Sequence, residues 1–467
     1  MRDHGMRQPA DGARGGYSTQ ELAAWDREFL WHPFTPMKPW CEEKEIIVIE
    51  RGEAEFLIDT EGRRYIDGSS SIWCNVHGHC VPELDEAVRD QLTKIAHTTL
   101  LGLTNVPAAL LGKRLVELAR SCGLALDRVF YSADGSTAVE VACKMAYQMR
   151  GQKEGRFLAL EGAYHGDTVG AVSVGGIGAF HDAFRGLCFA ADFVRAPRTT
   201  DAVPAALDTM RRLLRQGNHA GIVVEPIVTG AGGMIVQGAG FLRGVRQLAD
   251  EFDVLLIADE VMTGFGRTGK MFACQHEGVT PDLLCLSKGI TGGYMPLGAT
   301  LATQRVFDAF YADPREGKTF FHGHTFTGHP LACAVALASL DLFEQRDLMT
   351  HVQRMSQLIE RLLEPLRGRT FVRDVRCCGM IGAIELGDAR GESVPSNWRV
   401  GGELCRQMRE LGLMLRPLGD VVVVMPPLAI GEESLMRLLA GVVESLNWVD
   451  DIVVRKRGED PLREEPG

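Results

Sequence analysis

The chain has 467 residues, of which 45% are hydrophobic and 24% are charged, and its formal net charge is −11 at pH 7. This composition is ordinary for a globular protein, and the negative charge argues against a nucleic-acid partner. No apolar run approaches the ~18 residues of a membrane span, and residues 1–16 lack the apolar core of a signal peptide. The twelve cysteines form no C-x-x-C pair, which is typical of reduced thiols and predicts a cytoplasmic protein.

Five segments are predicted along the chain. Both ends, residues 1–16 and 455–467, are rich in charge, glycine and proline and are expected to be flexible. Residues 86–345 alternate short apolar runs with amphipathic stretches of helical length, which predicts a large α/β domain with a mostly parallel sheet. Residues 346–454 predict a smaller α+β domain, and residues 17–85 are expected to contribute to it and to the active site.

The expected strands of the large domain are continuous apolar runs, as in strands covered on both faces. They lie at 129–131, 222–227, 254–258 and 283–286. An amphipathic stretch at 137–149 predicts a helix, and a long helix is expected at 340–366. The strands expected after that helix are 371–372, 381–384 and 421–424.

The strongest chemical signal is a carboxylate and a lysine that each follow an apolar run. Asp259 and Lys288 lie 288 − 259 = 29 residues apart. The carboxyl ends of parallel strands converge on the crevice where α/β proteins bind ligands. A carboxylate beside a lysine there suits pyridoxal phosphate chemistry, in which the amine forms a Schiff base and the carboxylate keeps the pyridine nitrogen protonated. Spacing alone, however, favours a buried ion pair or a helix cap.

Two loops upstream offer further contacts. In the segment 132–137, Gly135 and Ser136 precede a helix, whose N-terminus can bind a phosphate. The alternative is a simple N-cap formed by Asp134 or Ser136. In the segment 162–167, Tyr164 could stack on a flat ring or could pin a turn by packing.

Two further patterns remain open at this point. The histidines at 77, 79, 322, 324 and 329 invite a metal site. They have no carboxylate or cysteine at ligand spacing, so a structured loop is favoured and no metal is predicted. Arg416 precedes Pro417 at the edge of an apolar strand, where its guanidinium could bind a substrate carboxylate or form a surface salt bridge.

Together these elements resemble the class III, fold-type I aminotransferases, which use pyridoxal phosphate. The stretch 256–269 (Leu-Ile-Ala-Asp-Glu-Val-Met-Thr-Gly-Phe-Gly-Arg-Thr-Gly) is similar to that family's signature and continues through Pro281-Asp282 to Ser287-Lys288-Gly289. The resemblance extends from about residue 31 to 427. It implies an α/β fold with a large domain built on a mostly parallel seven-stranded sheet, and a smaller α+β domain.

Within this class the chain is most similar to the branch that acts in biotin synthesis. That resemblance implies amino transfer to 8-amino-7-oxononanoate, which gives 7,8-diaminononanoate, in a homodimer with active sites at the subunit interface and without nucleic-acid or membrane partners. The segments that carry it are 31–37, 67–73, 100–105, 322–333, 415–417 and 425–427.

The resemblance also implies residue roles. Lys288 would hold the cofactor and then act as a base, and Asp259 would pair with the pyridinium nitrogen. Arg416 would bind the carboxylate of the oxononanoate. The expected cofactor-binding residues are Gly135, Ser136, Tyr164, Asp259, Lys288 and His324, together with Thr325 from the second subunit. The expected substrate-binding residues are Phe34, Ile72, Trp73, Tyr164, Lys288, Gly323 and Arg416.

Three departures from the family concern the amino donor. Members that use S-adenosylmethionine typically carry Tyr, Trp and Tyr where this chain has Phe34, Ile72 and Val423, and aromatic faces favour a sulfonium cation. The donor is therefore expected to be S-adenosylmethionine or lysine.

Three rival functions are compatible with parts of the pattern. An ω-aminotransferase for ornithine or 4-aminobutyrate would keep the fold, but Arg416 and the segment 31–37 speak against it. A non-catalytic cofactor-binding protein is disfavoured because both Lys288 and Asp259 are retained. An aminomutase or decarboxylase on the same fold is disfavoured by the segments that resemble the biotin branch.

Overall fold

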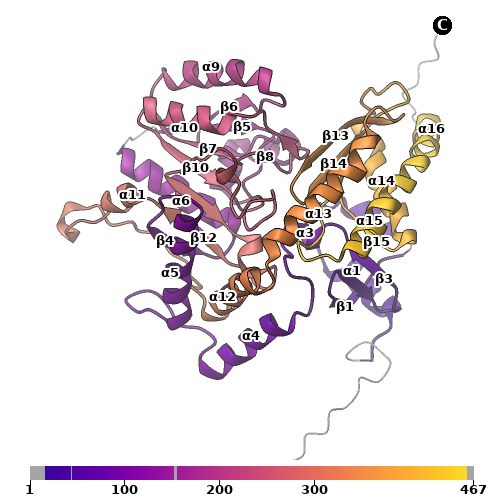
Figure 1. Cartoon of the computed structure of the whole chain (residues 1–467), viewed down its shortest axis with the longest axis horizontal. Helices are drawn as coiled ribbons and strands as arrows, with labels where there is room; N and C mark the ends of the chain where they lie inside the picture. Colours follow the sequence, from indigo (N-terminus) through magenta and orange to yellow (C-terminus); the bar gives the residue numbers. More distant parts are fainter. Residues whose placement is uncertain (1–15, 44, 152–154, 460–467) are drawn as a thin grey trace, which may run out of the picture.

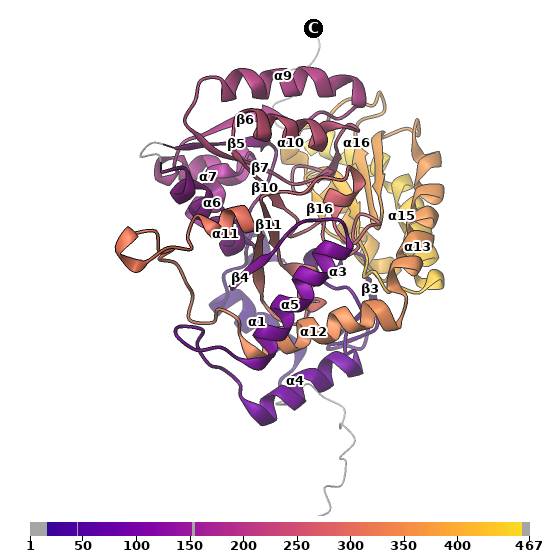
Figure 2. The same ribbon diagram turned by 60° about the vertical axis from the view of Figure 1, so that its left-hand side comes forward.

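The computed structural model describes residues 16–43, 45–151 and 155–459. The structure has a large α/β unit and a smaller unit, formed mainly by the C-terminal residues drawn in orange and yellow in Figure 1. Figure 2 shows the helices of the large unit arranged around its central sheet. Within the described ranges, every helix is too short or too polar to cross a membrane.

The large unit is built on a seven-stranded sheet with the order β4-β12-β11-β10-β7-β5-β6. Strand β12 runs antiparallel to both of its neighbours, and the other neighbouring pairs are parallel. The predicted mostly parallel seven-stranded sheet is therefore confirmed. Its strands are β4 (Arg128–Ser132), β5 (Arg156–Glu161), β6 (Ala191–Arg195), β7 (His219–Val224), β10 (Leu255–Asp259), β11 (Leu283–Leu286) and β12 (Gly298–Ala302).

Both faces of this sheet are buried, which explains the continuous apolar runs in its strands. Along β10, Leu255 and Ile257 pack on the side of helix α6, whereas Leu256 and Ala258 pack into the larger core on the other side. The larger core includes residues of α5, α9, α10 and α12. These helices are α5 (Val106–Ser121), α6 (Gly135–Arg150), α9 (Val203–Leu214), α10 (Phe241–Glu251) and α12 (Pro330–Gln345).

The smaller unit contains two four-stranded sheets. One is antiparallel, with the order β13-β14-β17-β16, and helices α13 and α15 pack against its core. The other has the order β1-β2-β3-β15, so the N-terminal and C-terminal segments share a sheet. The strands are β1 (Ile49–Glu53), β2 (Phe56–Asp59), β3 (Arg64–Asp67), β13 (Val372–Cys378), β14 (Ile381–Leu386), β15 (Leu413–Met414), β16 (Pro417–Leu418) and β17 (Val421–Val424).

The remaining elements connect these sheets or cover their edges. The helices are α1 (Thr19–Phe29), α2 (Met37–Glu42), α3 (Ser70–Trp73), α4 (Pro82–Lys94), α7 (Val169–Val174), α8 (Gly178–His181), α11 (Gln304–Asp308), α13 (Leu348–Leu363), α14 (Val400–Gln407), α15 (Glu432–Ser445) and α16 (Val449–Glu459). Two short strands, β8 (Val228–Thr229) and β9 (Ile235–Val236), form a separate hairpin.

The structure corrects one local prediction. The single helix expected over 340–366 is wrong, because α12 ends at Gln345 and α13 begins at Leu348. Between them Asp347 has φ 43°, a left-handed conformation that interrupts the helical path. Helix α16 ends at Glu459 and so includes the first residues of the predicted tail 455–467. Of the two predicted flexible ends, residues 1–15 and 460–467 lie outside the described residues, and the domain boundaries stay predictions.

Candidate active site

Asp259 and Lys288 meet at the carboxyl edge of the central sheet. Asp259 is the last residue of β10, and Lys288 follows the end of the parallel neighbouring strand β11 by two residues. Asp259 is buried and Lys288 is partly buried. The Nζ atom of Lys288 lies 4.9 Å from the ring centroid of Trp73, which comes from the N-terminal segment. The structure therefore brings these three predicted residues to one place.

The surroundings of Lys288 favour its neutral amine. Burial lowers the pKa of Lys288, and the nearby carboxylates of Asp259 and Glu225 oppose that shift without cancelling it. A lysine with a lowered pKa offers more of the uncharged form, which is the form that acts as a nucleophile or base. The backbone of Lys288 is also left-handed, with φ 45°, a conformation that functional sites often hold at some cost in stability.

The second partner of Asp259 is His165, whose role the sequence did not reveal. His165 Nδ1–H donates to Asp259 Oδ2 at 2.7 Å, and the backbone N–H of Val261 donates to Asp259 Oδ1 at 3.0 Å. Burial acts to lower the pKa of His165, but the hydrogen bond to Asp259 and its charge outweigh burial and raise that pKa. His165 lies between Tyr164 and Gly166, so the sequence showed a histidine in the segment 162–167. The sequence did not show that Asp259 is its hydrogen-bond partner.

The predicted phosphate loop forms the start of helix α6. Asp134 caps the helix by accepting the N–H of Thr137 at 2.8 Å, as the simpler interpretation proposed. A capped helix still presents first-turn N–H groups at its positive end, so the cap is compatible with the phosphate site, which stays a prediction. A Cβ atom at Gly135 would lie 2.6 Å from Cγ1 of Val261, so only glycine fits beside the segment that follows Asp259. Ser136 Oγ accepts the N–H of Thr168 at 3.3 Å.

Tyr164 is held by two carboxylates that the sequence pattern did not indicate. Its hydroxyl donates to Asp167, and its backbone N–H donates to Glu225 Oε2 at 3.2 Å. Burial, with the hydrogen bond to Asp167, raises the pKa of Tyr164. Burial also raises the pKa of Glu225 to about 7. The ring of Phe34 packs edge-on against Tyr164, with 6.3 Å between the ring centroids.

Ile72 and Trp73 belong to a backbone turn of unusual geometry, which we call the Ser70–Trp73 turn. Its four residues have φ values of 42°, 49°, 66° and 67°. Left-handed backbone costs roughly 1–2 kcal/mol for each residue other than glycine. The side chain of Ile72 is exposed, and that of Trp73 lies against Lys288. The turn thus places Trp73 against Lys288 and leaves the neighbouring side chain of Ile72 exposed.

Arg416 has a free guanidinium. It follows strand β15, and its backbone N–H donates to Ser69 Oγ at 3.0 Å, next to the Ser70–Trp73 turn. Its side chain is exposed, and the described part of the chain offers its guanidinium no ion-pair partner. Among the described residues the surface salt bridge considered as its alternative is therefore not formed, and the guanidinium can donate to a carboxylate.

A second arginine, Arg267, was missed as a site residue although it lies in the signature stretch. Its guanidinium is buried and donates to the Pro426 carbonyl at 2.7 Å and to Ser70 Oγ at 3.3 Å. Burial lowers the pKa of Arg267 to about 9. Arg267 therefore connects the loop after β10 to the Ser70–Trp73 turn through hydrogen bonds.

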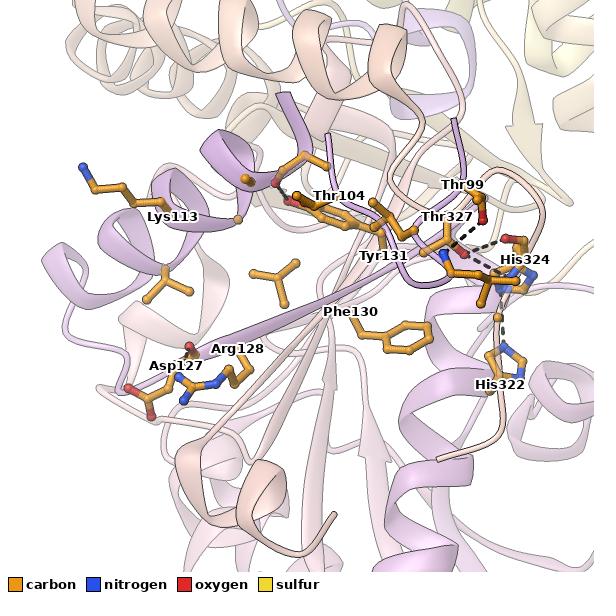
Figure 3. Close-up of a pocket in the computed structure, with 18 of the residues that line it drawn as sticks. Thr99, Thr104, Lys113, Asp127, Arg128, Phe130, Tyr131, His322, His324 and Thr327 are labelled. Carbon is orange, nitrogen blue, oxygen red and sulfur yellow. Dashed lines mark hydrogen bonds between the residues drawn. The ribbon is translucent and has the colours of Figure 1, made fainter. Parts of the chain in front are cut away.

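The loop that contains Gly323, His324 and Thr325 lies apart from Lys288 within one chain. Gly323 and His324 line a pocket of about 680 Å³, shown in Figure 3, together with residues such as Tyr131. Lys288 does not line this pocket. Thr325 is exposed. Within the pocket lining, Gly323 and His324 are thus not joined to Lys288, and the role of Thr325 in a second subunit stays a prediction.

The histidines of this loop contact each other and a lysine. His322 Nδ1 accepts from Lys144 Nζ at 2.9 Å, and His322 Nε2 lies 3.4 Å from His324 Nε2. Over residues 16–43, 45–151 and 155–459, no group of three His, Cys, Asp or Glu side chains has an arrangement that could hold a metal ion. His322 and His324 are accordingly parts of a structured loop.

Comparisons with known proteins agree with this geometry. The model of the family "Aminotransferase class-III" matches residues 39–446. An adenosylmethionine-8-amino-7-oxononanoate aminotransferase from Geobacter sulfurreducens is 53% identical over 93% of this chain and 99% of the relative. The enzyme of that name from Aquifex aeolicus is 46% identical over 91% of this chain and 96% of the relative.

Solved structures give the same result. The crystal structure of the enzyme of that name from Methanocaldococcus jannaschii has a TM-score of 0.88 and 41% identity, and the match covers 92% of this chain and 99% of that one. An amine transaminase from an uncultivated Pseudomonas species, in a PLP-bound form, has a TM-score of 0.84 and 33% identity, with 90% and 98% of the two chains covered. The predicted fold and family are thereby confirmed: this chain belongs to the class III aminotransferase family.

Proposed function

We propose that this chain transfers an amino group to 8-amino-7-oxononanoate, with pyridoxal phosphate as cofactor and S-adenosylmethionine or lysine as amino donor. One observation carries the proposal. A lysine with a lowered pKa lies beside Asp259 and Trp73, and Arg416, whose guanidinium has no ion-pair partner among the described residues, bonds through its backbone N–H to Ser69, next to the same N-terminal turn. The substrate 8-amino-7-oxononanoate has a ketone and a remote carboxylate. Its conversion requires a residue that handles the transferred amine, here Lys288, and a residue that binds the carboxylate, here Arg416. Relatives such as the Geobacter sulfurreducens enzyme are named for this substrate.

The residues present fit pyridoxal phosphate. The start of α6 at Gly135 closely approaches the segment after Asp259, because a Cβ atom there would clash with Val261. This close approach puts the positive end of a 16-residue helix beside the buried carboxylate. A phosphorylated ring with a cationic nitrogen matches both charges. Gly135 and Ser136 would hold the phosphate, Tyr164 would stack on the ring, and Asp259 would pair with the ring nitrogen.

Pyridoxal phosphate, when bound, supplies an aldehyde that takes up amino groups and a ring that accepts electrons. Lys288 Nζ, which burial keeps more easily deprotonated, acts as the base that moves a proton to and from the carbon bearing the amine. Asp259 would place its negative charge at the ring nitrogen, and His165 orients that carboxylate through its 2.7 Å hydrogen bond. Donor and acceptor use the same residues in turn, which is a ping-pong order.

The substrate contacts follow from the same placement. Arg416 binds the carboxylate of the oxononanoate through its guanidinium. Ile72 and Trp73 line the approach to Lys288, and Phe34 lies at the edge of Tyr164. Phe34 has no hydroxyl to bond an amine, and Ile72 offers no aromatic face to a sulfonium, so the choice between the two donors is left to experiment.

We include a homodimer in this proposal. Of the residues that line the 680 Å³ pocket, Leu101 is exposed over 82% of its surface, and Phe321, the chain neighbour of the lining residue His322, is exposed over 85%. Exposed apolar groups of this size, clustered at a pocket, are typical of protein interfaces. In the dimer, Gly323, His324 and Thr325 of one chain would complete the phosphate and substrate sites of the other. A cytoplasmic location is part of the proposal and is supported by twelve free cysteines.

The test is a direct assay. The purified protein with pyridoxal phosphate is given 8-amino-7-oxononanoate and either S-adenosylmethionine or lysine, and 7,8-diaminononanoate is measured by mass spectrometry. We expect diamine with at least one donor. Absence of diamine with both donors, together with turnover of 4-aminobutyrate or ornithine, would refute the substrate assignment and leave the family assignment intact.

A further inference from the structure

The Ser70–Trp73 turn lies between two parts of the proposed substrate site: Lys288, which contacts Trp73, and Arg416, which bonds to Ser69. The buried carboxylate of Asp67 bonds to this turn. We propose that Asp67 is a positioning residue: its hydrogen bonds hold this turn in its left-handed form and thereby set Trp73 against Lys288 and Arg416 at its working distance. The part that concerns Arg416 rests on the proposed function, whereas the part that concerns Trp73 and Lys288 does not.

The turn needs something to hold it. All four residues are left-handed, and none is glycine. For a β-branched residue such as Ile72, and for a bulky one such as Trp73, a φ above 60° is a rare conformation. A conformation of this kind persists only where its surroundings impose it. The segment would otherwise relax and carry Trp73 away from Lys288.

Asp67 supplies hydrogen bonds to the turn. It ends strand β3, and its side chain is 1% exposed. Asp67 Oδ1 accepts the backbone N–H of Ser71 at 3.0 Å, and Oδ2 accepts the Ser71 hydroxyl at 2.8 Å. His79 Nε2–H donates to Oδ2 at 3.1 Å, while its Nδ1 accepts from Asn75 Nδ2 at 3.2 Å. The contact with Asn75 fixes the histidine tautomer that donates to the carboxylate.

Close packing does not replace these hydrogen bonds. Ser71, Asn75 and His79 line a pocket of about 350 Å³, so this side of the turn faces open space. The side chains of Ser71 and Ile72 are exposed. With space on one side and solvent on the other, few apolar contacts restrain these two residues. The carboxylate of Asp67 and the Cys74 thiol, which donates to the Ser71 carbonyl at 3.1 Å, therefore restrain the middle of the turn.

The same short stretch also places Arg416. Asp67 pairs in register with Met414 of β15, and Ser69 Oγ accepts the backbone N–H of Arg416 at 3.0 Å. Arg416 and Trp73 are thus attached to the two sides of one turn. If the turn changes shape, the separation between the carboxylate anchor and Lys288 changes with it. A misplacement of about 1 Å at a reacting centre can cost about 100-fold in rate.

The experiment compares Asp67→Asn with Asp192→Asn in the full-length protein. Asp192 is a matched control, because it accepts His219 Nε2–H at 2.9 Å and Arg156 at 2.8 Å, at a distance from the Lys288 site on strand β6. Both proteins are labelled with fluorotryptophan, and the ¹⁹F resonance of Trp73 is assigned with Trp73→Phe. This resonance is recorded with and without pyridoxal phosphate. Activity is measured as kcat/KM for the oxononanoate.

We expect Asp67→Asn to shift and broaden the Trp73 resonance in both states and to lower kcat/KM by about 100-fold, while Asp192→Asn leaves both unchanged. A wild-type resonance and kcat/KM in Asp67→Asn would overturn the proposal, even if its thermal stability fell as far as that of the control.

If Asp67→Asn does not fold, Ser71→Ala replaces it. This change removes only the 2.8 Å hydroxyl contact of an exposed residue, and we expect the same direction of resonance shift with about a tenfold loss of kcat/KM. An unshifted resonance in Ser71→Ala overturns the inference. Should the wild-type protein not convert the oxononanoate, the proposed function fails, but the Trp73 resonance still decides the role of Asp67.

Discussion

His165 Nδ1 lies 2.7 Å from Asp259 Oδ2, and the two side chains are almost completely buried at the end of strand β10. The hydrogen bond with Asp259 raises the pKa of His165 although burial opposes it. A histidine that holds its proton beside a carboxylate stabilises the ionised form of that carboxylate. His165 thus holds the negatively charged carboxylate of Asp259 where the proposed cofactor nitrogen would lie.

Replacement of that charge tests its role. We expect Asp259→Asn to lower kcat by about 1,000-fold, the loss found when a preorganised charge partner is removed. Asp282→Asn is the control, since Asp282 is also buried but lies at the opposite end of β11, where it accepts from Arg246 at 2.8 Å. That control should lose stability and keep its kcat. Equal kcat in Asp259→Asn and the wild type would contradict the assignment.

Lys288 is the residue on which turnover depends. Lys288→Ala should abolish transamination, because no other described amine lies against Trp73 at this edge of the sheet. Lys270→Ala, which changes an exposed lysine that donates to the Gln275 carbonyl, should retain the native rate. The readout is diamine formation together with the change in cofactor absorbance when an amine is added. The mechanism is wrong if Lys288→Ala still cycles at the native rate.

Arg416 should act on acceptor binding. A hydrogen-bonded charge pair contributes about 1.5–3 kcal/mol, so we expect Arg416→Met to raise KM for the oxononanoate by about 10- to 100-fold with a smaller change in kcat. Arg361→Met, in an exposed position on α13, serves as the control. Steady-state kinetics at several acceptor concentrations separate KM from kcat. An unchanged KM in Arg416→Met would exclude Arg416 as the carboxylate anchor.

Glu260 gives a prediction about pH. Its carboxylate accepts the N–H groups of Ala273 and Cys274, and burial raises its pKa to about 7, above the ordinary 4.5. The folded protein therefore binds this proton more tightly than the unfolded chain. The free energy of unfolding therefore falls as pH rises from about 4.5 to about 7, by up to about 1.4 kcal/mol per pH unit.

Glu260→Gln should make that slope shallower, and urea unfolding at several pH values between these limits measures it. Burial raises the pKa of Glu225 to about 7 as well. In this variant Glu225 therefore still contributes to the decrease of the unfolding free energy with pH. Glu444→Gln changes an exposed glutamate of α15 and should leave the slope as it is. A slope in Glu260→Gln equal to that of the wild type would contradict the prediction.

The shared active site can be tested by mixing inactive variants. The mixed dimer contains one chain with Lys288→Ala and one chain with the disabling substitution Thr325→Tyr. The test assumes that Thr325 of each chain acts in the active site of the other. One of the dimer's two sites then combines the wild-type lysine of one chain with the wild-type threonine of the other. Random reassociation should restore about a quarter of the wild-type activity. If Thr325 acted within its own chain, mixing would restore nothing.

Much of the site could be predicted because it depends on strand ends. Asp259 and Lys288 each follow a continuous apolar run, and parallel neighbouring strands finish at the same edge of a sheet. Their proximity therefore followed from order and spacing. Gly135 followed in the same way, since a turn of small residues between a strand and an amphipathic stretch marks a helix N-terminus. The resemblance to the family added roles for these positions.

The sequence by itself thus determined four strands of the central sheet (β4, β7, β10 and β11), helix α6 and the pair at the carboxyl edge, because hydrophobic periodicity is a local property of the chain. The full seven-stranded sheet was implied only by the resemblance to the family. Tertiary structure alone decided the left-handed turn at Ile72, which serine, isoleucine and tryptophan do not favour locally, and the break at Asp347 inside an apparently continuous helix. It also decided that Asp67 supports Trp73 and that Arg416 stands free. Such contacts join residues far apart along the chain, and only the packing of the whole molecule brings their atoms within hydrogen-bond distance.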